Sequence, residues 1–194
     1  NEVWSKLHQG LWFFHMSSTM IFVAVIPYTK FFHFLALPIQ AFLTPKRRGG
    51  ILGPMNSFGL SKFSEMTMKN RFDLISCVEC GRCTEVCPAL AAGKNLNPKT
   101  IITKARDLAF ESHKNGIADP LFWGEKPIYE GHELDACTTC AACMEECPAH
   151  IEHVNIIMEA KRYKALTLSD LPPSATDATN KSKIHGNPLG IFQE

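Results

Sequence analysis

The sequence predicts an all-α protein in which one transmembrane helix precedes a helical domain. Two observations indicate this fold class. An apolar stretch near the amino terminus is long enough to cross a membrane, and apolar residues at helical spacing lie between and after two copies of a cysteine motif. The chain of 194 residues carries a formal net charge of +1, so its composition gives no indication of a nucleic-acid partner.

All eight cysteines lie in two copies of the motif C-x2-C-x2-C-x3-C-P, at 77–88 and 137–148. This motif is typical of proteins that hold two [4Fe-4S] clusters. In these proteins the first three cysteines of one copy bind one cluster and the fourth binds the other. Cluster 1 is therefore predicted to bind Cys77, Cys80, Cys83 and Cys147. Cluster 2 is predicted to bind Cys137, Cys140, Cys143 and Cys87.

Zinc and disulfides explain the cysteines less well. A structural zinc site usually takes paired C-x2-C units or mixed Cys and His, and a third cysteine at the same short spacing does not suit a tetrahedron. A disulfide framework needs an oxidising compartment and tolerates irregular spacing, whereas this spacing is repeated. Because iron–sulfur clusters pass single electrons, the first functional hypothesis is electron transfer. The thiolates indicate a reducing, cytoplasmic environment.

The segment 11–43 is the most apolar part of the chain, with Lys30 as its one charged residue. If Pro27 is a kink within one helix, the segment exceeds the roughly 20 residues needed to span a bilayer. A basic cluster follows at 45–48, which predicts that this end faces the cytoplasm. We therefore expect a single-pass segment in the inner membrane. The chain begins with Asn1 and shows no signal peptide, and we expect it to be part of a longer protein or of a split gene.

Two histidines in this segment, His15 and His33, are candidate haem ligands. On one continuous helix they would be five turns apart, on the same face and separated by roughly 27 Å. One would then lie near each membrane surface. Ionisable residues in a membrane are functional candidates, and axial haem ligation is one such role. We predict two b haems, each taking one ligand from this chain. The alternative is that both histidines lie at helix ends and bond to water or neighbouring groups.

The cysteine domain is expected to be helical around its motifs. Asn97 and Pro98 form a helix start, with helical spacing continuing to Asn115 and Gly116. A second helix is expected at 151–166. The predicted organisation is a membrane helix at 1–45, a linker at 46–70, the cysteine domain at 71–168, and a linker or tail at 169–194.

The two motifs and the helix from Pro98 resemble the alpha-helical ferredoxin module, with two [4Fe-4S] clusters, found in the C subunit of heterodisulfide reductase. The stretch 26–33 with His15 looks like the last haem-bearing helix of a nitrate reductase gamma-type cytochrome b. This order is similar to that of fused membrane iron–sulfur oxidoreductases associated with fatty-acid oxidation. The stretch 187–190 resembles the linker that precedes their cysteine-rich CCG domains.

The resemblance implies an electron-transfer segment of a membrane-bound quinone oxidoreductase. Electrons would pass between a soluble flavoprotein or dehydrogenase donor, the two clusters, b haems and menaquinone or another quinone. The remaining haem helices and a CCG-type cluster domain would come from other segments or subunits, so this chain is not expected to be catalytic alone. One alternative is a soluble iron–sulfur adaptor that passes electrons between cytoplasmic flavoproteins or to a heterodisulfide reductase-like partner. Another is a zinc-stabilised scaffold without redox function.

Overall fold

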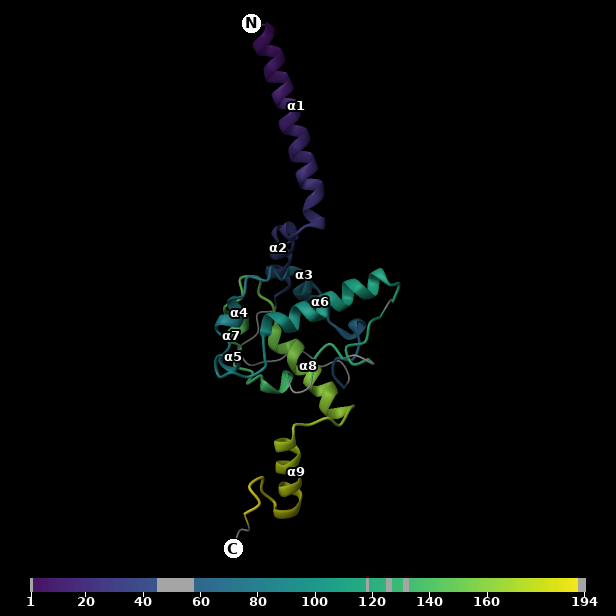
Figure 1. The fold of residues 1–194 in the computed structure, drawn as a ribbon, viewed down its shortest axis with the longest axis vertical. Helices are drawn as coiled ribbons and strands as arrows, with labels where there is room; N and C mark the ends of the chain where they lie inside the picture. Colours follow the sequence, from purple (N-terminus) through teal and green to yellow (C-terminus); the bar gives the residue numbers. More distant parts are fainter. Residues whose placement is uncertain (1, 45–57, 118, 125–126, 131–132, 192–194) are drawn as a thin grey trace.

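The computed structural model describes residues 2–44, 58–117, 119–124, 127–130 and 133–191, and all statements below concern these ranges. Figure 1 shows a long helix projecting from a body of shorter helices, with a further helix at the opposite end. The described residues form helices and no strands, and one isolated β-bridge joins Lys62 to Leu121. The all-α prediction is therefore confirmed for this part of the chain.

The amino-terminal region is two helices and not one. Helix α1 covers Glu2–Val25, two short 3-10 helices follow at Ile26–Tyr28 and Lys30–Phe32, and α2 covers His33–Leu43. Pro27 has no N–H to donate, and Thr29 is extended with φ −121° and ψ 171°. The expectation of one kinked helix was therefore wrong. The five-turn register between His15 and His33 does not hold, because helical phase is lost at the break.

Helix α1 has the length and apolarity of a membrane span. The candidate span Glu2–Tyr28 has a mean hydropathy of 1.5, and no residue of α1 is buried against the rest of the chain. Large side chains including Trp4, Leu11 and Phe14 are exposed. An exposed apolar surface of this kind is typical of contact with lipid or with another protein.

Helix α2 joins this projecting region to the body, where it packs against α3 (Met68–Ser76). Thr67 caps α3, since its Oγ1 accepts from the backbone N of Asn70 at 3.1 Å. The range 46–70 was expected to be a linker, and 45–57 lies outside the described residues. The remainder is wrong as a linker, because Leu60 and Met66 are buried in the core. Their apolar side chains pack against the other buried residues of the hydrophobic core.

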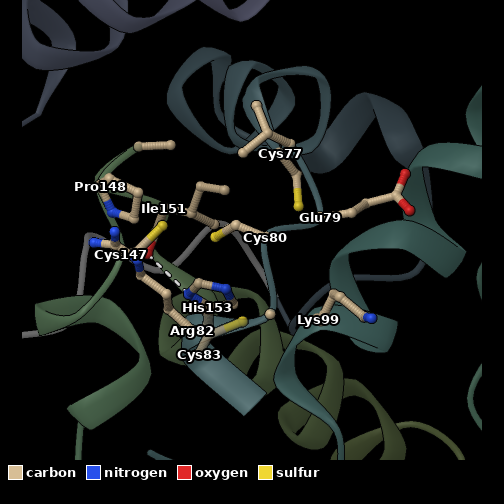
Figure 2. Close-up of a pocket in the computed structure, with 13 residues that line it drawn as sticks. Cys77, Glu79, Cys80, Arg82, Cys83, Lys99, Cys147, Pro148, Ile151 and His153 are labelled. Carbon is tan, nitrogen blue, oxygen red and sulfur yellow. Dashed lines mark hydrogen bonds between the residues drawn. The ribbon is translucent and has the colours of Figure 1, made fainter. Parts of the chain in front are cut away.

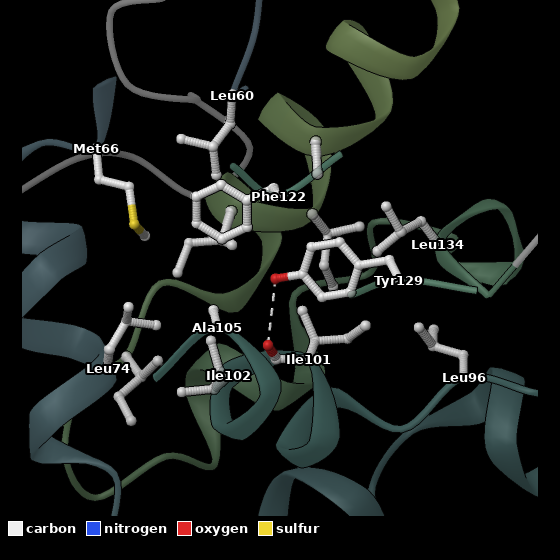
Figure 3. Packing of buried hydrophobic residues seen from close by; sticks show 14 of the residues in the cluster. Leu60, Met66, Leu74, Leu96, Ile101, Ile102, Ala105, Phe122, Tyr129 and Leu134 are labelled. Atoms are coloured by element: carbon white, nitrogen blue, oxygen red, sulfur yellow. Dashed lines mark hydrogen bonds between the residues drawn. The ribbon is translucent and has the colours of Figure 1, made fainter. Parts of the chain in front are cut away.

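Helix α6 (Pro98–Lys114) forms the centre of the body. The Asn97 side chain caps it by accepting from the backbone N of Lys99 at 3.1 Å, as the sequence predicted. Its residues Ile101, Ile102 and Ala105 are fully buried. Figure 3 shows them beside Phe122 and Tyr129, whose hydroxyl donates to the Ile101 carbonyl at 3.2 Å. This core supports the cysteine motifs from one side.

Helix α8 (His153–Leu166) begins two residues later than expected and is held closely by the chain before α3. Gly59 has φ +107°, and a Cβ there would lie 2.5 Å from the backbone N of Tyr163. Only glycine fits, and the next residue donates from Leu60 N to the Glu159 carbonyl at 3.0 Å. The expected tail instead contains α9 (Pro173–His185), which has no buried residue. Pro173 at its start and Gly186 after its end are typical helix boundaries.

Candidate metal centres

The eight cysteines line two hollows. The first is lined by Cys77, Cys80, Cys83 and Cys147. The second is lined by Cys87, Cys137, Cys140 and Cys143. Figure 2 shows the four cysteines of the first hollow around one space. Each hollow thus brings together three cysteines of one motif and the fourth of the other, the sets that the sequence predicts. The iron–sulfur bonds themselves stay a prediction.

The two motifs repeat the same backbone path. Glu79 and Gly81 have φ of 60° and 86°, and Thr139 and Ala141 at the equivalent positions have φ of 58° and 62°. A short helix follows in each copy, α4 (Arg82–Glu85) and α7 (Ala142–Glu145). Left-handed residues of this kind occur in the backbone turns that surround anionic iron–sulfur sites. The backbone N of Thr139 donates to Cys137 Sγ at 3.4 Å.

The third and fourth cysteines of each motif are buried, whereas Cys80 and Cys140 are exposed. Burial raises the pKa of the Cys83 thiol to about 11 and that of Cys143 to about 12. The pKa values of Cys77 and Cys147 are raised by burial as well. Without a metal these thiols would hold their protons. Iron would displace the protons and supply the positive charge that stabilises thiolates.

The ligand sets have the composition that a [4Fe-4S] cluster takes in two-cluster proteins, three cysteines of one motif and the fourth of the other. A tetrahedral zinc places four sulfurs 2.3 Å from one point, so that the sulfurs would lie only about 4 Å apart. In a [4Fe-4S] cluster the four thiolates surround a larger group, and their sulfurs are accordingly farther apart.

The two hollows are joined by packed side chains. Cys83, Cys143 and Val154 form one buried cluster, with Met144 and Met158 at its edge. Helix α4 packs against α7 at the same place. The third cysteines of the two motifs therefore belong to one buried cluster, which connects the two hollows.

The surroundings of the first hollow contain charged and titratable groups. Arg106 of α6 pairs with Glu79, with 2.9 Å between Nη2 and Oε1. His153 is 1% exposed and lines the hollow, and its Nδ1 lies 3.0 Å from the Ile151 carbonyl oxygen. Burial lowers the pKa of His153 to about 4. The imidazole is therefore neutral at pH 7.

Behind the first hollow lies a buried polar node, defined as Gln40, Lys69 and Asp73. Lys69 Nζ lies 2.5 Å from Asp73 Oδ1 and also donates to the His150 carbonyl at 2.8 Å. Gln40 Nε2 donates to Asp73, which also accepts from the backbone N of Glu152 at 3.2 Å. Burial raises the pKa of Asp73 to about 6, although Lys69 opposes the shift. The node fixes α2 and α3 to the segment that follows Cys147.

Sequence reasoning missed this node. Lys69 and Asp73 are four residues apart on a helix, a spacing that indicates a pair on one face. Gln40 gave no signal, because its partner is 33 residues away in the chain.

The two candidate haem ligands lie in different settings and are not brought together. His15 is exposed within α1. His33 is half-buried as the first residue of α2, and its ring stacks on Phe34 with 4.4 Å between centroids. His33 also lines a hollow that Cys77 borders.

Comparison with known proteins identifies the cysteine region. Residues 76–151 match the family described as 4Fe-4S dicluster domain. The chain is 30% identical over 213 residues to an EtfAB:quinone oxidoreductase of Syntrophomonas wolfei, covering 95% of this chain and 30% of that protein. It is 28% identical to a probable iron-sulfur-binding oxidoreductase, FadF, of Bacillus subtilis, covering 93% of this chain and 31% of that protein.

Shorter matches concern the same region. A probable membrane-anchored ferredoxin of Chromohalobacter salexigens is 31% identical over 151 residues, which is 69% of this chain and 22% of that protein. The chain thus spans about a third or less of the length of these relatives. No solved structure matches it. Residues 76–151 thus match a 4Fe-4S dicluster domain, and the chain is similar over most of its length to a quinone oxidoreductase and to a probable iron-sulfur-binding oxidoreductase.

Proposed function

We propose that this chain is the electron-transfer segment of a membrane-bound quinone oxidoreductase. It relays electrons between a soluble flavoprotein or dehydrogenase donor, two [4Fe-4S] clusters, b haems and menaquinone or another quinone. The observation that carries the proposal is the pair of cysteine-lined hollows in contact, preceded by a helix of membrane-spanning length. The similarity to the Syntrophomonas quinone oxidoreductase supports the same assignment.

In this proposal the crossed cysteine sets hold the clusters. Cluster 1 takes Cys77, Cys80, Cys83 and Cys147, and cluster 2 takes Cys137, Cys140, Cys143 and Cys87. When bound, each cluster accepts and gives one electron. The chain's own part is to hold the clusters, to exclude water from their buried cysteines and to keep them close together. It has no catalytic residue of its own in this scheme.

Helix α1 is the proposed membrane span, with the dicluster domain on the cytoplasmic side of the inner membrane. Two observations support this location: the exposed apolar surface of α1, and the similarity of the chain to the probable membrane-anchored ferredoxin of Chromohalobacter. The basic cluster at 45–48 that indicated the cytoplasmic side lies outside the described residues. Further helices and a CCG-type cluster domain would come from other segments or subunits.

His15 and His33 remain the proposed axial ligands of two b haems, but the position of one no longer supports the assignment of the other. The break between α1 and α2 removes the shared helical face. His15 lies on the exposed surface of α1, where a partner helix would supply the opposing ligand. His33 lies beside the hollow that Cys77 borders, so a haem there would be close to cluster 1.

A reduced-minus-oxidised optical spectrum of the purified native assembly tests the scheme. Broad cluster bleaching together with sharp haem b bands is the expected result. His15→Ala and His33→Ala should each remove part of the haem bands and leave the cluster bleaching intact. His8→Ala is the matched control, because His8 is also exposed on α1 and has no proposed role. Haem bands that survive both substitutions would exclude these ligands, and absent cluster bleaching would exclude the relay.

The second candidate function is a soluble iron–sulfur adaptor that transfers electrons to a heterodisulfide reductase-like catalytic partner. A specific observation favours it. The chain is 36% identical over 90 residues to the C subunit of a CoB-CoM heterodisulfide reductase of Methanosarcina acetivorans, covering 46% of this chain and 45% of that protein. Extraction separates the two functions. The adaptor would leave membranes in alkaline carbonate, whereas a protein with α1 in the bilayer would require detergent.

A further inference from the structure

A third hollow lies where the projecting helix meets the body, and we call it the junction hollow. It has three walls. The break between α1 and α2 forms the first wall, with His33 at its end. The second wall is the end of α3 and the start of the first motif, including Cys77 and Glu79. The third is the face of α6 that carries Arg106 and Phe110.

The walls of the junction hollow suit a flat ring with oxygen atoms at its rim. Phe32, Val78 and Phe110 give it apolar and aromatic surface. Arg106 supplies a cation that is 18% exposed, and it already bonds to Glu79 and Asp107 through Nη2 and Nε. A guanidinium has five N–H donors, so donors remain for a third acceptor. Aromatic walls favour stacking of a conjugated ring.

The position of the hollow points to a partner held in the membrane. The candidate span ends at Tyr28, which is one of the lining residues. Cys77 lines both this hollow and that of cluster 1. By contrast, the residues that line the hollow of cluster 2 all lie at Cys87 or later in the chain. Only the first of the two cluster hollows therefore shares a lining residue with the junction hollow.

We propose that the junction hollow receives the flat conjugated ring of a membrane-borne redox group, with oxygen atoms of the ring facing Arg106. Cluster 1 is then the terminal of the relay that faces the membrane, and cluster 2 is the terminal that faces the soluble donor. This inference rests on the proposed function. A quinone, through its carbonyls, and a haem, through its propionates, share this chemistry.

The electron balance is simple. A reduced cluster held by Cys77, Cys80, Cys83 and Cys147 would lose one electron, and the ring would gain it. If the ring is a quinone, two such electrons and two protons taken from water would form the two O–H bonds of the quinol. If it is a haem, one transfer reduces its iron. The reverse direction uses the same contact.

The first test measures reoxidation of cluster 1 by menaquinone-4 in vesicles that contain the whole native assembly. Arg106→Gln is expected to raise the half-saturating menaquinone-4 concentration roughly tenfold, since a charge-assisted hydrogen bond is lost. Lys114→Gln is the matched control, because Lys114 is a cation of the same helix α6 and lines neither cluster hollow nor the junction hollow. It should leave half-saturation unchanged.

A second variant keeps the test independent of charge. Phe110→Trp narrows the junction hollow, and Phe110 is 58% exposed, so the change does not disturb the core. It should slow reoxidation, whereas Ile117→Trp, at an exposed site after the end of α6, should not. If Arg106→Gln and Phe110→Trp both behave as the unsubstituted protein while the clusters still reduce, the inference is wrong and the proposed function stands. If the unsubstituted assembly shows no clusters, the proposed function itself fails.

Two further measurements identify the ring and the order of the clusters. Labelling of 75–79 or 106–110 by a photoreactive naphthoquinone, with protection by menaquinone-4, assigns a quinone. Loss of haem bands in both Arg106→Gln and His33→Ala assigns a haem, and neither result overturns the proposal.

Substitution of one ligand in each cluster tests the order of the two clusters in the relay. Cys140→Ser should leave cluster 1 able to react with the membrane acceptor. Cys80→Ser should leave cluster 2 reduced, and fast reoxidation of cluster 2 in that variant would refute the order.

Discussion

The two cysteine hollows have the same loop geometry and different surroundings. In both motifs the third and fifth residues are left-handed, and a four-residue helix follows. Around the first hollow lie the pair Arg106–Glu79, the buried His153 and the polar node of Gln40, Lys69 and Asp73. The position of Glu79 is taken in the second motif by Thr139, which is uncharged.

This difference shows that the residues that would bind a cluster are distinct from those that would set its potential and its partner. Each twelve-residue motif provides three cysteines to one hollow and the fourth cysteine to the other. The distinct surroundings provide charge, polarity and proximity to the break between α1 and α2. Two chemically equal clusters can therefore differ in potential and in partner, because nearby charges and solvent access set the potential of a cluster.

The largest expected effect tests whether the ligand sets cross between motifs. Each single serine substitution of a ligand should remove one cluster, so that iron falls from about eight to about four atoms per chain. In the crossed arrangement, Cys80→Ser with Cys147→Ser also leaves about four, since both belong to cluster 1. Cys80→Ser with Cys87→Ser should leave close to none. Iron and sulfide analysis decides, and the opposite result for the two pairs would mean that each motif holds its own cluster.

Substitution of one buried lysine near each hollow should lower the thermal stability of one cluster more than that of the other. Lys69→Met removes the cation that pairs with Asp73 near the first hollow. Lys164→Met removes a cation that pairs with Asp135, just before Cys137. Loss of one partner of a buried ion pair costs about 3 to 5 kcal/mol. We expect Lys69→Met to release cluster 1 first on warming, and Lys164→Met to release cluster 2 first. EPR of partly denatured samples measures the order. Equal loss of both clusters in each variant would mean that the domain opens as one unit.

The pH dependence of the polar node gives a smaller and more specific test. Burial raises the pKa of Asp73 to about 6, from 3.8. Between these values the unfolded chain has released the proton and the folded chain keeps it. The stability from this group is therefore complete below about pH 4 and is lost as pH rises to about 6. Infrared titration of the Asp73 carboxyl band, assigned with Asp73→Asn, should show a midpoint near 6. A midpoint near 4 would show that Lys69 outweighs burial.

The smallest expected effect concerns the fifth residue of each motif. Ala141 has φ +62° and Gly81 has φ +86°, and a Cβ added to Gly81 meets no atom within 4 Å. Backbone strain alone therefore separates the two residues. Ala141→Gly should stabilise cluster 2 and Gly81→Ala should destabilise cluster 1, each by about 1 kcal/mol. Thermal bleaching of cluster absorbance measures both. The reverse pattern, with Ala141→Gly destabilising and Gly81→Ala stabilising, would show that chain entropy outweighs strain at this position.

Local patterns predicted much of the fold, because they need only neighbouring residues. Asn97 and Pro98 set the start of α6, and the all-α class followed from helical spacing around the motifs. The amino-terminal helix was predicted too long, since composition alone does not show where Pro27 and Thr29 interrupt hydrogen bonding. The segment 58–70 was misread as a linker, since burial of Leu60 and Met66 depends on helices far along the chain.

The sequence by itself determined the chemistry of the centres. Eight cysteines in a repeated C-x2-C-x2-C-x3-C-P motif specify soft thiolate ligands at the spacing of two clusters, and that information is local. Only the tertiary structure decided what surrounds each cluster. Gln40 meets Asp73 and Arg106 meets Glu79 across long stretches of chain, and the junction hollow forms from three separate segments. Such contacts depend on how the helices pack, and a local sequence motif does not specify which distant residues will lie beside it.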